Sequence, residues 1–406
     1  MAQASRISLR CLSIAIVAGL ATGALAGLTA CGAPAAEPLP QTDAGVLQPE
    51  PDAGSGSGDA DAGTDAGTPP APCTEDGACF IDWADLEPYP VAVDHHTTFV
   101  HEGPAGAYLH VMGGVRVLNE AFQAMYPQLR RAKIGANGSL GEWEVAGTLP
   151  ASLSFHGLAR AGDRTYLVAG LTTSGGQPSV NGVTYVLDYD SEGKPTVRTG
   201  SGVAEAFLHP GVASVGGRLY VVGGSGTTHN PKGTVLVSTL GEDGLNGAWS
   251  AGPGLPQPRS HHAVVVHDER MYLVGGFTTG QVPLNDVLRS VHDATGALTG
   301  WEAVGTLESS PWTHAAFVHG EWLYVVGGGE GGPGQERYVA RTRRARIAPD
   351  GTLGEFEEVA GLLPVPRAHV HQTPVHDGRI YSVGGRLFPA LTTIDRVFIG
   401  TFLKGS

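Results

Sequence analysis

Histidine is the residue type whose number and spacing most suggest chemistry in this sequence. The chain has 16 His against 25 Lys plus Arg, and imidazole can bind metal ions, transfer protons or form hydrogen bonds near neutral pH. Most of these histidines recur in step with a repeated glycine, in two registers that are five residues apart. The first register contains His156, His262, His314 and His371. His96 belongs to it once a longer turn in its repeat is allowed for, and His209 is offset by one position. The second register contains His101, His267, His319 and His376.

The two registers cannot be ligands of one metal ion. Both lie in short apolar segments typical of strands, where five residues span about 17 Å and an odd offset points side chains to opposite faces. We therefore predict two separate rings of histidine, and we assign no catalytic residue, metal ligand or cofactor. Two interpretations stay open for the first register. One is a ligand or metal site around His156, His262 and His314; the other, favoured by the regular repetition, is imidazoles that hydrogen-bond turns of their own repeat.

The glycines that define these registers end a strand-like segment that occurs six times at nearly regular intervals. A turn such as Asp243-Gly244, followed by an aromatic residue such as Trp249, keeps the same phase in four copies. A period of about 50 residues with strand-like content indicates the blades of a β-propeller. The six copies end at Gly114, Gly170, Gly224, Gly276, Gly328 and Gly385.

These features resemble the kelch repeat, which has a Gly-Gly doublet after a Tyr-containing strand, a downstream Trp and an Arg/His segment opening the next repeat. The resemblance covers about residues 83–403 and implies an all-β, six-bladed kelch-type β-propeller. Some kelch relatives are copper radical oxidases with a Cys cross-linked to a Tyr, but this chain has no Cys after Cys79. Other relatives are sialic acid mutarotases, which need only polar channel residues, so that alternative stays open.

The ends of the chain predict how the ring of blades closes. In four repeats an aromatic residue precedes a His by one constant interval, as Trp249 precedes His262, and Trp83 precedes His96 by the same interval. Trp83 therefore opens an outermost strand without inner strands before it, whereas residues 392–402 supply the third strand of the last blade. We expect these terminal strands to share one sheet, which hides its edge and limits the propeller to six blades.

Propeller topology predicts where a ligand would meet the chain. The connections between blades lie on the same face as the loops between the second and third strands, and these loops vary most, as recognition loops usually do. We expect a protein or glycan ligand there, with a sugar-active enzyme at the channel mouth as the alternative. The candidates at the channel mouth are the first-register histidines with Arg259 and Arg367, the arginines being struts between blades in the other interpretation; the candidates on the loops are Arg116, His229, Arg337 and Arg386.

The N-terminal part of the chain predicts export and a lipid anchor. Arg6 and Arg10 precede an apolar stretch that ends in Leu28-Thr29-Ala30-Cys31, which resembles the lipobox of bacterial lipoproteins. Residues 1–30 are then a signal peptide and Cys31 carries the lipid; ordinary cleavage with an incidental Cys31 is the other interpretation. Residues 31–72 are an acidic Asp/Ala/Gly/Pro tether whose composition predicts disorder. Residues 73–406 are the propeller, with a disulfide predicted between Cys73 and Cys79.

Composition narrows the classes of function. With 61 Gly, 28 Pro and 16% charged residues, the sequence is typical of short strands joined by tight turns and excludes a coiled coil. Its net charge of −14 disfavours nucleic-acid binding, because an acidic surface repels phosphate. We therefore expect a monomeric, non-catalytic binding or scaffold propeller in the bacterial cell envelope, held at the outer membrane by its lipid.

Overall fold

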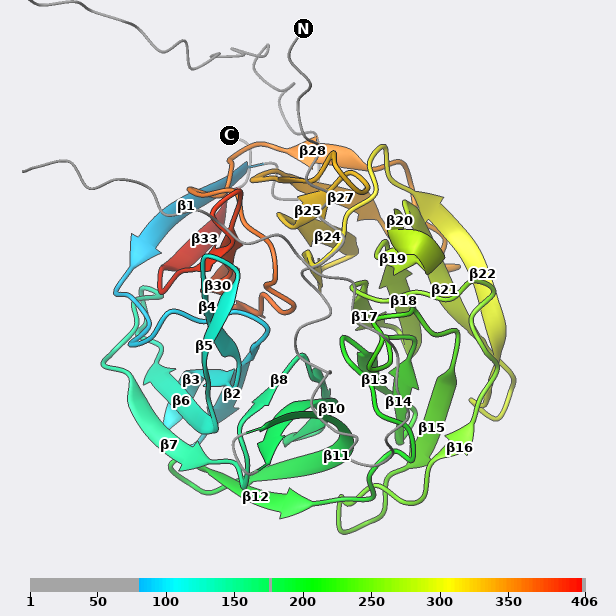
Figure 1. The fold of residues 1–406 in the computed structure, drawn as a ribbon, viewed down its shortest axis with the longest axis horizontal. Coiled ribbons are helices and arrows are strands. Elements are labelled where there is room, and N and C mark those ends of the chain that lie inside the picture. The colour runs from blue at the N-terminus through cyan, green and yellow to red at the C-terminus, as the bar shows by residue number, and fades with distance from the viewer. Residues whose placement is uncertain (1–79, 175–176, 404–406) are drawn as a thin grey trace, which may run out of the picture. The chain divides into compact units, whose positions relative to one another are not determined.

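The computed structural model describes residues 80–174 and 177–403, which form a ring of six antiparallel sheets around a central axis (Figure 1). This confirms the predicted all-β, six-bladed propeller. The signal peptide, the tether, Cys31, Cys73 and Cys79 lie outside the described residues, so what was predicted for them stays a prediction. No helix within the described ranges is long and apolar enough to cross a membrane.

The strands of the first three blades follow the chain from the axis outward. Blade 1 contains β2 (Thr97–Gly103), β3 (Gly106–Met112), β6 (Gln128–Lys133) and β7 (Glu144–Thr148). Blade 2 contains β9 (Gly157–Ala161), β10 (Arg164–Ser174), β11 (Gln177–Tyr189) and β12 (Pro195–Thr199), with β8 (Leu153–Ser154) beside β10. Blade 3 contains β13 (Gly211–Val215), β14 (Arg218–Val222), β15 (Val235–Thr239) and β16 (Ser250–Ala251).

The other three blades repeat this order, and the last one combines both ends of the described chain. Blade 4 contains β17 (Ala263–His267), β18 (Arg270–Val274), β21 (Asp286–His292) and β22 (Leu298–Thr306). Blade 5 contains β23 (Ala315–His319), β24 (Trp322–Val326), β27 (Thr342–Arg346) and β28 (Glu357–Val359). Blade 6 contains β29 (Val375–His376), β30 (Arg379–Val383), β33 (Val397–Leu403) and β1 (Phe80–Leu86).

Several loops between the second and third strands of a blade form small hairpins of their own. These are β4 (Val115–Leu118) with β5 (Ala121–Met125), β19 (Phe277–Thr278) with β20 (Val282–Pro283) across the 3-10 turn η2 (Thr279–Gln281), β25 (Gly329–Glu330) with β26 (Arg337–Tyr338), and β31 (Arg386–Leu387) with β32 (Thr392–Thr393). We call the face that carries them the loop face.

The ring closes by pairing the first described strand with the last. Strand β1 runs antiparallel to β33, from Phe80 opposite Leu403 to Leu86 opposite Val397. Trp83 lies in β1, so the predicted closure through an N-terminal outermost strand is confirmed. Because β1 covers the outer edge of β33, blade 6 has an outermost strand as the other blades do.

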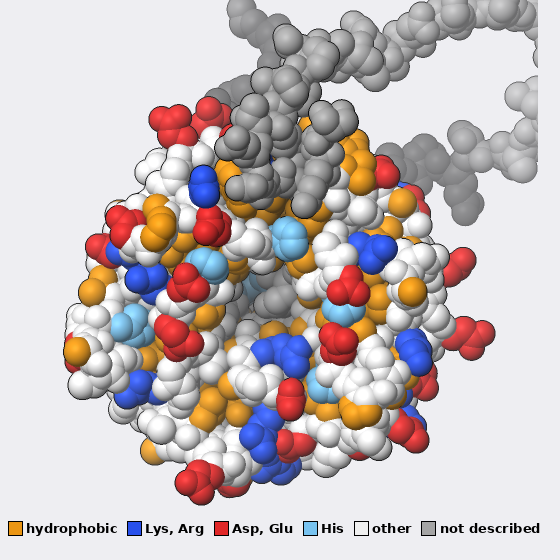
Figure 2. Space-filling view, turned by 180° about the vertical axis from the view of Figure 1, so that it is seen from behind, with side chains coloured by type: hydrophobic (Ala, Val, Ile, Leu, Met, Phe, Trp, Pro, Cys, Tyr) orange, Lys and Arg blue, Asp and Glu red, His pale blue; other side chains and the backbone are white. Residues whose placement is uncertain are grey.

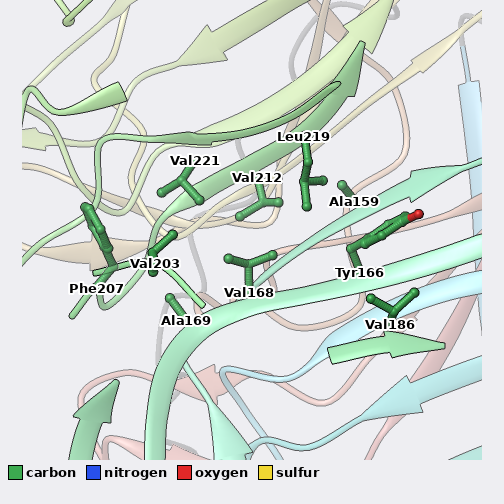
Figure 3. Packing of buried hydrophobic residues seen from close by; sticks show 10 residues of the cluster. All are labelled: Ala159, Tyr166, Val168, Ala169, Val186, Val203, Phe207, Val212, Leu219 and Val221. Atoms are coloured by element: carbon green, nitrogen blue, oxygen red, sulfur yellow. The ribbon is translucent and has the colours of Figure 1, made fainter. Parts of the chain in front are cut away.

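Apolar side chains fill the space between each pair of neighbouring blades. Figure 3 shows the cluster between blades 2 and 3, where Val168 of β10 faces Val212 of β13 and Val221 of β14. The aromatic residues that follow the repeated turns pack at such clusters, as Trp249 does here and Trp301 does between blades 3 and 4. Since each fully buried aliphatic side chain stabilises a fold by about 1.5–3 kcal/mol, burial between blades holds the ring together.

The repeated tyrosine and the repeated turn glycine are bonded to each other across blades. The Tyr166 hydroxyl in blade 2 donates a 2.7 Å hydrogen bond to the carbonyl of Gly244 in the turn of blade 3. Equivalent bonds join Tyr272 to Gly351 (3.0 Å) and Tyr381 to Gly138 (3.1 Å). Two sequence marks that looked independent are therefore the two halves of one contact.

The substitution Tyr166→Phe is expected to destabilise the propeller by about 1–2 kcal/mol, because it removes this bond and leaves a buried carbonyl without it. Urea unfolding followed by circular dichroism measures the loss. Tyr220→Phe is the matched control, since the buried Tyr220 hydroxyl has no hydrogen-bond partner in the described ranges. Equal losses in both variants would contradict the contribution assigned to the bond.

Candidate functional site

Six residues, one at the start of each blade, surround the central axis with a left-handed backbone. Such positive φ angles are uncommon outside glycine, yet they recur here in every blade. We call these residues the axial ring: His95 (φ 50°), Phe155 (56°), His209 (50°), His261 (59°), Thr313 (46°) and His369 (64°).

Backbone hydrogen bonds explain why this strained conformation is kept. The N–H of Phe155 donates to the carbonyl of His95 at 3.1 Å, and the N–H of His209 donates to the carbonyl of Phe155 at 2.9 Å. The same bond runs from Thr313 to His261, from His369 to Thr313 and from His95 back to His369. These five bonds join neighbouring blades at the axis and hold the backbone from which the imidazoles of the ring project.

The first-register histidines lie one residue after the axial ring and are buried between blades. His96, His156, His262 and His314 are 1%, 3%, 6% and 1% exposed. The His156 imidazole lies beside Gly113 of blade 1 and places Nε2 2.8 Å from Oγ1 of Thr97. This placement fits a structural role, although the contact is with the preceding blade and not with a turn of the same repeat. The structure does not bring these four side chains to the channel mouth.

His209 and His371 differ from this group. His209 belongs to the axial ring. Val370, and not His371, occupies the place beside Gly385 that His262 occupies beside Gly276. His371 is therefore an extra residue before β29, and the shared register that the sequence predicted for it is wrong. Its ring centre lies 5.5 Å from that of His95 and 5.6 Å from that of His209.

Arg259 and Arg367 are internal struts. Arg259 is fully buried, donates to the carbonyl of Gly275 at 3.3 Å and forms a 2.8 Å ion pair with Asp286. Arg367 is 2% exposed and donates to the carbonyl of Gly384 at 2.6 Å. All of these partners belong to the blade that the arginine opens, so both side chains act within a blade, where the sequence predicted struts between blades. Neither faces the channel mouth.

The loop candidates fall into two groups. Arg116 and His229 are exposed. Arg386 is mostly buried and pairs through Nε with Asp94 at 2.6 Å. Arg337 is largely exposed but lies 3.0 Å from Glu330.

Glu330 is a buried carboxylate that the sequence did not single out. It is 1% exposed and pairs with Arg337, with Arg341 at 2.5 Å and with Arg343. Burial alone would raise the pKa of Glu330, but hydrogen bonds from Arg341, Arg343 and Ser309 outweigh it and lower the pKa to about 2. The cluster joins β25 and β26 to β27 of the same blade.

Replacing Glu330 by Gln is expected to destabilise the protein by about 3–5 kcal/mol, because removing one member of a buried ion pair leaves its partners uncompensated. Chemical denaturation at pH 7 measures the change. Since the pKa of Glu330 lies below its unfolded value of 4.5, its contribution is present above pH 4.5 and is lost as the pH falls towards 2. Glu302→Gln is the matched control, because it removes an exposed carboxylate that pairs with Arg289. This substitution should lower the stability by under about 1 kcal/mol.

A chain of bonded polar groups runs across blades 1, 6 and 5. From Arg386 it passes through Asp94 to Nδ1 of His95 (2.5 Å), from Nε2 of His95 to Nδ1 of His369 (2.8 Å), and from Nε2 of His369 to the Tyr338 hydroxyl (3.0 Å). Burial, followed by neighbouring charges, lowers the pKa of His95 and His369 well below its usual value, and burial raises the pKa of Tyr338. The sequence did not single out His95 or His261. The feature that could have indicated them is the pair of consecutive histidines that each forms with the next residue, His96 or His262.

Two hairpins of neighbouring blades are bonded into one structure on the loop face. Thr393 Oγ1 accepts from the N–H of Val117 at 3.2 Å and donates to its carbonyl at 3.0 Å, and Thr392 Oγ1 accepts from the N–H of Asn119 at 3.2 Å. We call β4–β5 with β31–β32 the hairpin platform. It carries three exposed large apolar side chains: Leu118 (43%), Phe122 (42%) and Phe388 (44%).

The side of the propeller that is turned away in Figure 1 has a different character. Figure 2 shows acidic, basic and histidine side chains interspersed over it. Charges of mixed sign do not create the continuous positive field that attracts a nucleic-acid backbone.

Comparisons with known proteins agree with this geometry. A Kelch motif family model matches residues 258–289, which run from the connection into blade 4 to its third strand. Kelch-like protein 38 of Mus musculus is 24% identical over 250 residues, 62% of this chain. These matches identify a kelch repeat in the chain and a similarity to kelch-repeat proteins. The Kelch repeat protein M-T8 of Myxoma virus (strain Lausanne) is 26% identical over 166 residues, 37% of the chain.

This chain matches less than half of the length of either relative. The alignments span 39% of the mouse protein and 30% of the viral protein. Among solved structures, "Structure of YjhT" superimposes with a TM-score of 0.59 and 14% identity, covering 77% of this chain and 95% of that one. At this identity the likeness is one of fold.

Proposed function

We propose that this kelch propeller is a binding module that docks a protein ligand on the hairpin platform. The observation that carries the proposal is the exposure of Leu118, Phe122 and Phe388 on two hairpins that are bonded to each other. Single exposed apolar residues are ordinary, but a group of them on one rigid surface marks an interaction site.

The surroundings of the platform support this proposal. Phe122 lies 6.2 Å from Phe155 of the axial ring, and Phe388 lies 5.5 Å from Tyr338, between ring centres. The exposed apolar residues thus continue inward into aromatic side chains near the axis, and aromatic residues are enriched at protein interfaces. Arg116, exposed on β4 of the same platform, adds a positive charge at its edge.

The proposal places this module in the bacterial envelope. Cys31 would carry the lipid, and a tether formed by residues 32–72 would let the propeller reach about 35 Å from the membrane by random-coil scaling. Labelling with radioactive palmitate tests the anchor. Label that Cys31→Ala still incorporates would contradict lipidation at that position.

The binding role is tested by probing peptide and glycan arrays with the full chain. We expect peptide binding that the double variant Phe122→Ser/Phe388→Ser loses. Val145→Ser is the matched control, because Val145 is equally exposed (50%) but lies on the outermost strand of blade 1. Binding retained by the double variant, or a response to glycans alone, would contradict a protein ligand on this platform.

A second candidate is a sugar-active enzyme of the channel mouth, similar in activity to the sialic acid mutarotases. The observation that favours it is the bonded chain from Arg386 to Tyr338, an acid-base arrangement that is not repeated around the ring in the described ranges. Anomer exchange of sialic acid, followed by NMR, tests it with His369→Phe and with the control His267→Ala at the end of β17. Equal rates with wild type, variant and no protein would exclude this activity.

A further inference from the structure

Three histidines from three different blades meet on the propeller axis. His95 opens blade 1, His209 opens blade 3 and the extra residue His371 precedes the first strand of blade 6. One ring nitrogen of each lies within 4.8 Å of the others. The imidazoles are thus held around a common point by elements that are far apart in the sequence.

Two of these imidazoles have nitrogen atoms that the protein does not satisfy. Nδ1 of His209 and Nε2 of His371 are buried and have no hydrogen-bond partner in the described part of the chain. A buried polar atom left unpaired costs about 1–3 kcal/mol, and almost all such atoms in native proteins have a partner. A ligand that accepts lone pairs from imidazole nitrogens would remove this cost.

The third imidazole is oriented as metal-binding histidines usually are. Nδ1 of His95 lies 2.5 Å from a carboxylate oxygen of Asp94, which is fully buried and paired in turn with Arg386 at 2.6 Å. A carboxylate on one ring nitrogen fixes the tautomer and directs the lone pair of the other towards a metal. Nε2 of His95 lies 2.8 Å from Nδ1 of His369, so a metal ion bound to Nε2 of His95 would replace this hydrogen bond and leave His369 as a fourth imidazole beside the group.

We propose that His95, His209 and His371 form an axial site for a divalent first-row transition metal ion, with Zn²⁺ as the best match. Three neutral imidazoles suit zinc, copper, nickel and cobalt and do not suit the oxygen-seeking Mg²⁺ and Ca²⁺. A zinc ion held by three histidines keeps a fourth position for water or another ligand. The ion would join blades 1, 3 and 6 across the axis, where the backbone ring joins neighbours only.

The side chains need a modest contraction to hold the ion. Zinc–nitrogen bonds of about 2.0–2.1 Å place two ligand nitrogens roughly 3.3 Å apart in a tetrahedral site, whereas the present limit is 4.8 Å. Rotation of the rings about their side-chain torsions supplies such a change without moving the strands. The sequence predicted no metal ligand here because it placed His371 in the register of His262.

The test titrates ZnCl₂ into the full chain after dialysis against a chelator. We expect saturable binding of one Zn²⁺ per chain and a rise in melting temperature that grows with zinc concentration. His209→Phe should abolish this binding while the fold is retained, because blade 2 already carries Phe155 at the same ring position with the same left-handed backbone. Asp94→Asn should weaken zinc binding by about 10–100-fold through loss of ring orientation.

The control is His267→Ala, which removes a histidine at the opposite end of β17 from His261 and should leave zinc binding unchanged. Circular dichroism confirms that each variant is folded, and His371→Val supplies a second ligand deletion if one variant is not. The absence of saturable zinc binding by the wild-type chain would overturn the proposal. So would a zinc affinity equal to that of the wild-type chain in folded His209→Phe or His371→Val.

Discussion

Deletion of residues 80–86 is expected to abolish cooperative folding of the propeller. These residues form β1, which pairs with β33 along its whole length and supplies Ile81, fully buried, to the cluster between blades 5 and 6. Without β1, the apolar face of β33 and its unpaired edge would be exposed to solvent, and an exposed edge strand invites aggregation. Circular dichroism and size-exclusion chromatography of the deleted chain measure the effect.

A graded version of this experiment separates closure from the presence of the segment. Ile81→Ala should cost about 2–5 kcal/mol, as expected for a large-to-small substitution in a core. Phe80→Ala is the control in the same strand, because Phe80 is 41% exposed and surface substitutions usually change stability by less than about 0.5 kcal/mol. A stable, monomeric deletion variant would show that the ring does not depend on closure by β1.

Acid is expected to destabilise the propeller well before its carboxylates titrate. Burial, followed by the charge of His371, lowers the pKa of His156 and His314 to about 3. His96 also faces His156, while Arg343 and Glu330 face His314. Because the folded pKa lies below the unfolded value of 6.5, the unfolded chain takes up protons first as the pH falls. Stability is therefore complete above pH 6.5 and declines between pH 6.5 and 3.

The expected size of this decline is large. Each such histidine removes about 1.4 kcal/mol per pH unit, so the pair removes at most about 5 kcal/mol between pH 6.5 and 4.5. Urea unfolding at several pH values measures the slope. His314→Val should reduce it by one histidine's share and keep the fold, because blade 6 carries Val370 at the equivalent position. An unchanged slope in this variant would contradict the role given to His314.

The candidate site was less predictable than the fold, for a local reason. His96, His156, His262 and His314 keep one register because they occupy the same place in each blade. His371 follows the same spacing in the sequence, yet one extra residue before β29 turns it into the channel. The number of residues between His371 and the glycine does not reveal where the extra residue lies, because its position depends on which side chain packs against Gly385.

Buried ion pairs were hidden for a similar reason. Glu330 and Arg343 lie on different strands, β25 and β27, and no motif marks them as partners. Arg259 and Arg367 were recognised as possible struts, but whether a strut acts within a blade or between blades depends on side-chain direction. In both cases the decisive quantity is a distance across a sheet.

The properties of the histidines likewise divide into those that the sequence determines and those that depend on tertiary structure. Their count, their period and the terminal strands follow from repetition, because each blade buries its apolar faces only against a neighbour and so must repeat the same pattern until the ring closes. That much the sequence determined by itself. The left-handed axial ring, the meeting of His95, His209 and His371, and the bonded chain to Tyr338 were decided by tertiary structure. Ring closure brings residues from the two ends of the propeller to one axis, and such contacts have no counterpart in sequence spacing.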